Sequence, residues 1–309
     1  MYDILIIGGG SSALSAALYA GKKGLSVAVI ADEVGGQLVT HAALPRMSFL
    51  GSDSALIMQN LRKAVTEQGV TILDEQGLVK NVSFRQENNK EIFVAEDQNG
   101  GKTEGRSVIL ASGRRGRKLG IAGEEQFADK GLAYHISPDP ALYKGRIVCI
   151  IGGGNSGLAL AMQLSGVAKQ LIIIEKVDRI TGDSMLCDAL AQEGKTTFIL
   201  NSDVKEIVGK ETVERVAYED KSVKEAKEIE VDEVIVSIGM IPNSEIAKEL
   251  CELNKWGEIV VNPRTNATSH LGIFAAGDVT DIADKEAPIA AGEGVKAAFS
   301  CMKWLEANI

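Results

Sequence analysis

The sequence predicts an α/β protein made of two Rossmann-like dinucleotide-binding domains of the three-layer ββα type, the second inserted into the first. An apolar strand, a Gly-rich turn, an Ala-rich helix and a second apolar strand follow one another near the start of the chain, and the same order returns at residue 146. Continuous apolar strands joined by a helix are typical of a parallel sheet that is buried on both faces. Two such units indicate two dinucleotide-binding domains.

In the first unit, residues 3–7 predict a strand and residues 26–30 the next strand. In the second unit, residues 146–151 and 171–174 predict the corresponding pair. In each unit the Gly-rich turn follows the first strand and opens the helix. The two units therefore form a loose internal repeat.

Between the repeats, polar and apolar residues alternate from residue 77 to residue 103, which predicts a small antiparallel insertion. Residues 113–118 and 239–243 are rich in turn residues and are predicted to carry the chain between the domains. The predicted domains are residues 1–113 with 244–309, and residues 118–239.

The first Gly-rich turn has the spacing of a phosphate-binding turn. Gly8-x-Gly10-x-x-Ala13 follows a strand and opens a helix, which is the context that this motif requires. The glycines permit a tight turn and close approach of a pyrophosphate to the backbone, while the helix N-terminus supplies N–H groups. Asp32 and Glu33 follow the next strand, where a carboxylate binds ribose hydroxyls. Either can serve, or both can be solvated loop charges.

The second turn repeats the motif as Gly152-x-Gly154-x-x-Gly157. Glu175 follows the next strand, and a carboxylate there accepts a hydrogen bond from a 2′-hydroxyl but repels a 2′-phosphate. NADH is therefore favoured over NADPH, although the neighbouring Lys176 keeps NADPH open. A turn that binds no nucleotide is the remaining alternative.

Composition excludes several classes of function. The chain has 309 residues and a net charge of −9, so attraction to nucleic acid or to an anionic membrane is not expected. No apolar run of membrane-spanning length and no basic leader is present, so a cytoplasmic protein is expected. No His or Cys spacing is typical of a metal site or a disulfide framework. The four cysteines are far apart: Cys149, Cys187, Cys251 and Cys301.

Further segments match, in order, the pattern of one family. They are Gly35-Gly36-Gln37-Leu38, Ala111-Ser112-Gly113, residues 118–124, residues 239–243, residues 274–279 and residues 290–294. With both Gly-rich turns, they make the chain resemble the low-molecular-weight thioredoxin reductase family over nearly its whole length. The second unit, with Asn155-Ser156-Gly157 and Glu175, is most similar to the NADH-using flavoprotein portion of alkyl hydroperoxide reductase. The resemblance implies FAD, a nicotinamide nucleotide and a homodimer.

Motif and resemblance together assign residues to the two cofactors. The residues implied for FAD are Gly8, Gly10, Ser11, Ala13, Asp32, Gly36, Gln37, Leu38, Val79, Ala111, Gly113, Gly277, Asp278, Glu286 and Ala287. The residues implied for NADH are Gly152, Gly154, Asn155, Ser156, Gly157, Glu175, Lys176 and Gly239. In the family, the Asp at the position of Asp278 binds the ribityl chain. Lys285 and Glu286 stand where relatives have Arg and Gln, and the negative charge of Glu286 would disfavour an anionic reduced flavin.

The chain departs from the family where relatives carry a redox-active Cys-x-x-Cys. It has His135-Ile136-Ser137-Pro138 there, so an ordinary, self-sufficient thioredoxin reductase is not expected. His135 is a candidate to donate a proton to reduced flavin or to an acceptor, with Asp139 orienting it. The alternative is that these residues fill the vacated space.

These observations predict an FAD-dependent oxidoreductase that passes electrons from NADH through the flavin to an external acceptor. A second hypothesis is a flavoprotein that exchanges electrons with ferredoxin or flavodoxin and carries a vestigial nucleotide domain. A basic run would then dock the acidic carrier; the run is Arg114, Arg115, Arg117 and Lys118. The alternatives for this run are a solvated linker or a contact with the FAD phosphates. A third hypothesis is a non-catalytic sensor of redox state or nucleotide.

Overall fold

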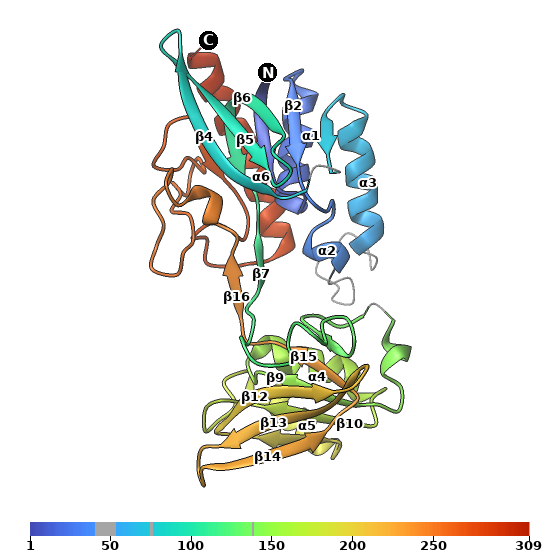
Figure 1. The fold of residues 1–309 in the computed structure, drawn as a ribbon. Helices are drawn as coiled ribbons and strands as arrows, with labels where there is room; N and C mark the ends of the chain where they lie inside the picture. Colours follow the sequence, from blue (N-terminus) through green and yellow to red (C-terminus); the bar gives the residue numbers. More distant parts are fainter. Residues whose placement is uncertain (41–53, 75–76, 138, 309) are drawn as a thin grey trace. The chain divides into compact units, whose positions relative to one another are not determined.

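The structure, a computed structural model, describes residues 1–40, 54–74, 77–137 and 139–308. The chain divides into two compact units, Met1–Arg115 with Ile241–Ile309, and Gly116–Met240 (Figure 1). The second unit is inserted into the first. The predicted fold class, two Rossmann-like domains with one inserted into the other, is confirmed.

The first unit is built on one twisted sheet. Its strands are β1 (Tyr2–Ile7), β2 (Val27–Ile30), β3 (Thr71–Leu73), β4 (Val79–Glu87), β5 (Lys90–Asp97), β6 (Lys102–Leu110) and β17 (Ile273–Ala275). Within the described residues the strand order is β3-β2-β1-β6-β5-β4, and β17 pairs with β6. The strands β3, β2, β1, β6 and β17 run parallel, whereas β4, β5 and β6 form an antiparallel meander. The predicted antiparallel insertion therefore extends the parallel sheet through β6.

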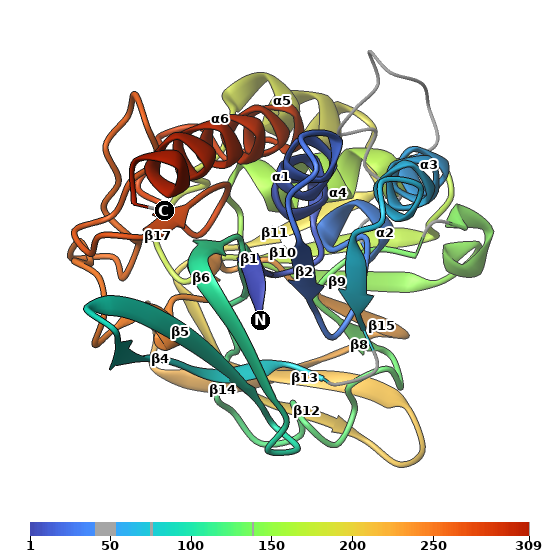
Figure 2. The same cartoon turned by 90° about the horizontal axis from the view of Figure 1, so that it is seen from above.

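Helices cover one face of this sheet. They are α1 (Ser11–Lys22), α2 (Gln37–Thr40), α3 (Ser54–Thr66) and α6 (Ala287–Ala307), and a short 3₁₀ helix, η3 (Glu245–Ala247), lies in the C-terminal segment. Figure 2 shows α1, α3 and α6 on one side of β1 and β2, with β4 and β5 on the other. Because side chains alternate along a strand, Ile4 and Ile6 of β1 join the helix-side core and Leu5 and Ile7 join the core beneath the meander.

The second unit repeats this layered plan. Its strands are β8 (Leu132–Ala133), β9 (Ile147–Ile151), β10 (Gln170–Ile174), β11 (Thr196–Ile199), β12 (Ser202–Gly209), β13 (Val213–Asp220), β14 (Glu225–Glu230) and β15 (Glu233–Val236). Its helices are α4 (Asn155–Ser165), α5 (Ser184–Gln192) and the 3₁₀ helix η2 (Pro140–Tyr143). The parallel strands lie in the order β11-β10-β9-β15-β8, and β12, β13 and β14 form an antiparallel sheet. Cys149 and Ile151 of β9 pack with Val216 of β13 in one core, so the antiparallel sheet covers one face of the parallel one.

Each of the two chain crossings contains a short strand. β7 (Arg114–Gly116) leaves the first unit, β16 (Met240–Pro242) returns to it, and the two pair with each other. Beside them, Ser112 Oγ donates to the carbonyl oxygen of Asn243 (2.6 Å), and Asn243 Nδ2 donates back to the carbonyl oxygen of Ser112 (2.8 Å). These reciprocal bonds hold both crossings at one place on the first unit.

None of the helices in the described part of the chain is both long and apolar enough to cross a membrane.

Candidate functional site

The first Gly-rich turn packs closely against two strand ends. The Gly8 N–H donates to the carbonyl oxygen of Ile30 (2.8 Å), at the end of β2. A Cβ at Gly8, where φ is 122°, would lie 2.2 Å from the carbonyl oxygen of Ala111, just after β6. Gly10 differs, since no described atom lies within 4 Å of the place where its Cβ would be. Gly8 therefore permits the tight turn, and Gly10 faces open space.

Helix α1 begins at this open space. Gly10 is its N-cap, no side chain caps it, and its first turn contains no acidic residue. The first intrahelical bond runs from the Leu14 N–H to the carbonyl oxygen of Gly10 (3.0 Å), so the N–H groups of residues 11–13 have no partner within the helix. Unpartnered N–H groups at the positive end of a helix dipole suit a pyrophosphate.

Segments distant in sequence converge on the start of α1. A Cβ at Gly36 would lie 3.0 Å from Gly10 Cα, and one at Gly277 would lie 2.7 Å from Ser12 Oγ. Ser11 Oγ donates to the carbonyl oxygen of Ala287 (3.3 Å), at the start of α6. The structure thus brings three of the segments predicted for FAD to the predicted phosphate-binding turn.

Other residues predicted for FAD vary in position. Leu38 is buried in the helix-side core, and Ala111 follows β6 directly. Asp32 and Glu286 are exposed, in the loop after β2 and at the N-cap of α6. Val79 is the first residue of β4 and packs against the core beneath the meander.

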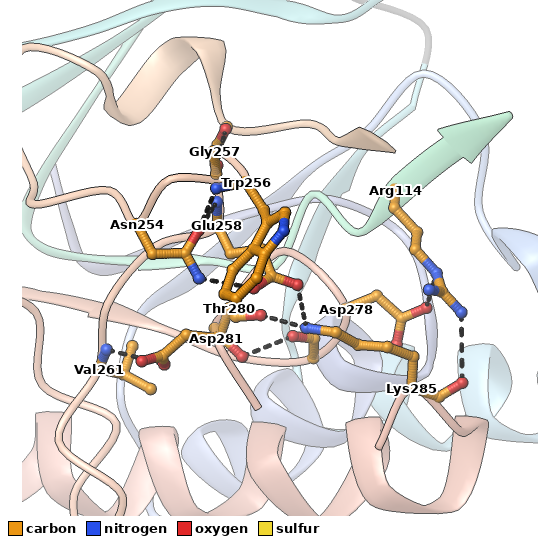
Figure 3. Close-up of polar contacts among 12 residues, drawn as sticks. Arg114, Asn254, Trp256, Gly257, Glu258, Val261, Asp278, Thr280, Asp281 and Lys285 are labelled. Atoms are coloured by element: carbon orange, nitrogen blue, oxygen red, sulfur yellow. Dashed lines mark hydrogen bonds and ion pairs between the residues drawn. The ribbon is translucent and has the colours of Figure 1, made fainter. Parts of the chain in front are cut away.

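A network of charged side chains lies beside this edge of the sheet (Figure 3). Arg114 Nε lies 2.9 Å from Oδ2 of Asp278, the residue predicted to bind the ribityl chain. Lys285 Nζ lies 3.0 Å from Oε1 of Glu258 and also donates to the carbonyl oxygen of Thr280. The Asp278 carboxylate therefore has a cation beside it, and Lys285 is held by a different partner.

The second Gly-rich turn has the same geometry as the first. The Gly152 N–H donates to the carbonyl oxygen of Ile174 (2.9 Å), at the end of β10. A Cβ at Gly152 would lie 2.2 Å from the carbonyl oxygen of Ser237, just after β15. A Cβ at Gly157 would lie 2.0 Å from the carbonyl oxygen of Gly152. Helix α4 begins after Gly154 with no side-chain cap and no acidic residue in its first turn. The turn can therefore receive phosphate in the same way.

A carboxylate closes this second turn. Glu175 Oε2 accepts a hydrogen bond from the Gly153 N–H (2.7 Å), and Oε1 accepts one from the Val177 N–H (3.2 Å). The adjacent Lys176 points to another carboxylate, with Nζ 3.0 Å from Oδ1 of Asp203 on β12. Glu175 is thus held at the turn, while the positive charge of Lys176 is compensated.

The remaining residues predicted for NADH lie at the start of α4 and at the end of the second unit. Asn155 Oδ1 accepts a hydrogen bond from the Asp183 N–H (2.7 Å), which joins the start of α4 to the loop before α5. Ser156 is exposed on the first turn of α4. Gly239 has a φ of 98°, and its carbonyl oxygen accepts from the Arg117 N–H (2.9 Å).

Residues 135–137, which stand at the position of the family's Cys-x-x-Cys, form no helix or strand. The Ser137 N–H donates to Tyr143 Oη (2.8 Å), and Asp139 Oδ1 accepts the N–H two residues further on (3.0 Å) to cap η2. His135 is half-buried, and Pro138 lies outside the described residues. That Asp139 orients His135 stays a prediction.

Most of the basic run is paired with local carboxylates. The pairs are Arg114 with Asp278 (2.9 Å), Arg115 with Glu245 (2.6 Å) and Lys118 with Glu125 (3.1 Å). Arg117 is exposed. Three of the four cations thus have a carboxylate beside them, and docking of an acidic carrier at this run stays a prediction.

Residues 2–298 match the model of the pyridine nucleotide-disulphide oxidoreductase family. The chain belongs to this family. An alkyl hydroperoxide reductase subunit of Staphylococcus aureus is 34% identical to it over 308 residues, which cover 99% of this chain and 60% of that protein. A protein named NADH dehydrogenase in Bacillus subtilis is 33% identical over 308 residues, which cover 99% of this chain and 59% of that protein. The chain thus spans about 60% of the length of these curated relatives.

Thioredoxin reductase of T. acidophilum has the same fold. It is 30% identical, with a TM-score of 0.81, and the match covers 100% of this chain and 99% of that one. The family and this thioredoxin-reductase-type fold imply FAD and a pyridine nucleotide as cofactors. The open space at Gly10 and the carboxylate held at the second turn fit such cofactors.

Two ion pairs at these sites could not be predicted from the sequence: Lys176 with Asp203, and Arg114 with Asp278. Asp203 lies on a different sheet from the strand that precedes Lys176, and nothing in the local pattern indicates that they pair. Arg114 is separated from Asp278 by the whole second unit. Its position directly after the Ala111-Ser112-Gly113 segment was the one available signal.

Proposed function

We propose that the protein is an NADH-dependent FAD oxidoreductase that delivers electrons to an external acceptor without a redox-active disulfide of its own. The observation that carries the proposal is the 2.7 Å hydrogen bond from the Gly153 N–H to Glu175, which holds a carboxylate at the nucleotide-binding turn. Bound FAD would supply the two-electron redox chemistry between the nicotinamide and the acceptor. The side chains bind and orient the cofactors.

Two features support NADH as the donor. A carboxylate at the position of Glu175 accepts a hydrogen bond from a ribose 2′-hydroxyl and repels a 2′-phosphate. Hydrogen bonds from Lys205 and Lys176 lower the pKa of Asp203 below its usual value, so Asp203 is ionised at neutral pH and compensates Lys176. Lys176 is therefore poorly available to a 2′-phosphate. The name of the Bacillus subtilis relative, NADH dehydrogenase, agrees with this donor.

The state of the cysteines supports a route without an enzyme dithiol. All four lie in the described part of the chain and none forms a disulfide there. Burial raises the pKa of Cys149 to about 12. Burial also raises the pKa of Cys301 to about 12, although its hydrogen bond with Ser107 opposes the rise. The half-buried Cys187 also has a raised pKa, because of burial and the nearby Asp188. Since the thiolate is the reactive form, none of these thiols is prepared for exchange at neutral pH.

An anaerobic titration of the FAD-loaded protein tests the proposal. NADH is added in steps while the flavin absorbance is followed, and NADPH is added to a second sample. One equivalent of NADH per FAD is expected to reduce the flavin completely, because no dithiol takes up a second electron pair. NADPH is expected to reduce it far more slowly. A C187S variant, which removes the most accessible thiol, should give the same stoichiometry as the wild type.

The other outcomes separate the hypotheses. A second equivalent of NADH would reveal a hidden two-electron group and contradict the dithiol-free route. A flavin that dithionite reduces but neither nucleotide reduces would refute NADH as donor. Rapid reduction by ferredoxin or flavodoxin in that case would establish the carrier-protein function, and no reduction by either carrier would favour a sensor.

A further inference from the structure

Arg114 is the most buried ion-paired member of the basic run. Its side chain is 24% exposed, and that of its partner Asp278 is 14% exposed. We propose that Arg114 is a positioning residue of the FAD site, which compensates the Asp278 carboxylate and thereby makes the site favour the reduced cofactor. The inference rests on FAD occupying the edge of the first unit that carries the Gly-rich turn.

Arg114 and Asp278 follow two neighbouring strands that run in the same direction. β6 ends at Leu110 and β17 at Ala275, and these two residues are opposite each other in a parallel pair. β1 is also parallel to β6 and ends at Ile7, just before the Gly-rich turn. In open α/β sheets, ligands bind outside the carboxyl ends of the strands. The ion pair therefore lies at the ligand-binding edge.

Contacts of Arg114 join three segments at this edge. Its carbonyl oxygen accepts a hydrogen bond from Gln37 Nε2 (3.2 Å). Its Nη2 donates to the carbonyl oxygen of Lys285 (3.4 Å), two residues before α6, and its Nε is paired with Asp278 (Figure 3). A change at Arg114 is therefore transmitted to segments that converge on the start of α1.

The Arg114 Nε–H is also a donor without a satisfied hydrogen bond. It lies within ion-pair distance of Asp278, yet no acceptor among the described residues meets hydrogen-bond geometry with it, and the atom is buried. A buried unsatisfied N–H is unfavourable. An acceptor atom of a bound cofactor would satisfy it, which is a second and independent reason to place Arg114 in the site.

The segment that carries Asp278 is rich in acidic residues. Asp281 and Glu286 lie close in sequence to Asp278, and Lys285 is already paired with Glu258 (3.0 Å). Without Arg114, Asp278 would be a poorly exposed carboxylate with no compensating charge. An uncompensated negative charge nearby raises the free energy of the reduced, more electron-rich flavin more than that of the oxidised flavin. Removal of Arg114 should therefore lower the flavin midpoint potential.

The variants R114Q and R114K of the whole chain test this inference. The midpoint potential is measured by equilibration with reference dyes, and the FAD dissociation constant by titration of the apoprotein. In R114Q, reduced FAD should lose about tenfold in affinity relative to oxidised FAD, a fall of about 30 mV for a two-electron couple. R114K should restore most of the potential, because it keeps the charge. R115Q is the matched control and should not change the potential, since Arg115 pairs with Glu245 instead.

A wild-type potential in R114Q with FAD bound would overturn the inference. If R114Q fails to retain FAD, the double variant R114Q/D278N, which removes both charges, decides. Recovery of FAD binding in the double variant supports charge compensation. If the double variant does not bind FAD and R114K does not restore the potential, the inference is overturned. Neither measurement uses nicotinamide or an acceptor. If the flavin potential depends on Arg114 but NADH does not reduce the flavin, the proposed function is contradicted and the inference about Arg114 stands.

Discussion

Lys176 and Asp203 form an ion pair, with Nζ 3.0 Å from Oδ1, between the loop after β10 and strand β12. Lys176, which would attract a 2′-phosphate, is therefore paired with Asp203, and the adjacent Glu175 would repel that phosphate. Selectivity for NADH would then depend on Asp203 as well as on Glu175.

We predict that D203A improves binding of NADPH by about threefold, the size expected for releasing an exposed ion pair. Lys176 is 70% exposed, so solvent screening keeps the effect small. The measurement is the dissociation constant of each nucleotide at low salt. In D203A/K176M the gain should disappear. A gain that persists without Lys176 would show that another group binds the phosphate.

Replacement of Glu175 should weaken NADH binding. In E175A the hydroxyl of the ribose loses a charged acceptor and the Gly153 N–H loses its partner, which should raise the dissociation constant for NADH about tenfold or more. Nucleotide binding is measured by titration calorimetry, with FAD content as the control for folding. Unchanged NADH affinity would contradict the assignment of Glu175 to the ribose.

Two glycines in α6 provide a matched test of packing against α1. A Cβ at Gly294 would lie 2.0 Å from the carbonyl oxygen of Ser12, whereas no described atom lies within 4 Å of a Cβ at Gly292. We expect G294A to lower the free energy of unfolding by about 2 kcal/mol or more, since overpacking forces the helices apart. G292A should raise it by up to about 1 kcal/mol, because Ala favours the helix. Denaturant titration of both variants measures these changes, and equal stabilities would contradict the close approach.

Glu124 should make the stability of the second unit depend on pH. Burial opposes ionisation of Glu124, but hydrogen bonds from Tyr134 Oη (2.7 Å) and from the N–H groups of Leu119 and Gly120 outweigh it, so its pKa is lowered. A lowered pKa in the folded state contributes stability above the usual value of 4.5, and this contribution is lost as the pH falls below it.

The variant E124Q measures this contribution. Near neutral pH it should be less stable than the wild type by about 1–3 kcal/mol, because an amide replaces a charged acceptor. The difference should shrink as the pH falls below the usual pKa of a Glu carboxyl. Y134F, which removes one of the donors to Glu124, should show a smaller loss. A difference between E124Q and wild type that is the same in acid and at neutral pH would rule out the ionised carboxylate as its source.

The sequence alone determined the fold class and the two nucleotide-binding turns. Each turn depends on residues within a few positions of one another, such as Gly8 and Gly10 or Gly152 and Gly154, and on apolar strands whose pattern is local. Such short-range patterns are visible without coordinates because backbone geometry and side-chain periodicity are set over a few residues. The lack of a Cys-x-x-Cys is equally a property of the sequence.

The tertiary structure decided which charges meet. Along the chain, Arg114 and Arg115 belong to one basic run, yet the fold pairs the first with Asp278 and the second with Glu245. The partner of Lys176 likewise comes from β12. Ion pairs between segments far apart in the chain depend on the packing of whole elements, so no local pattern reveals them. They decide which cations remain available to a cofactor or a partner.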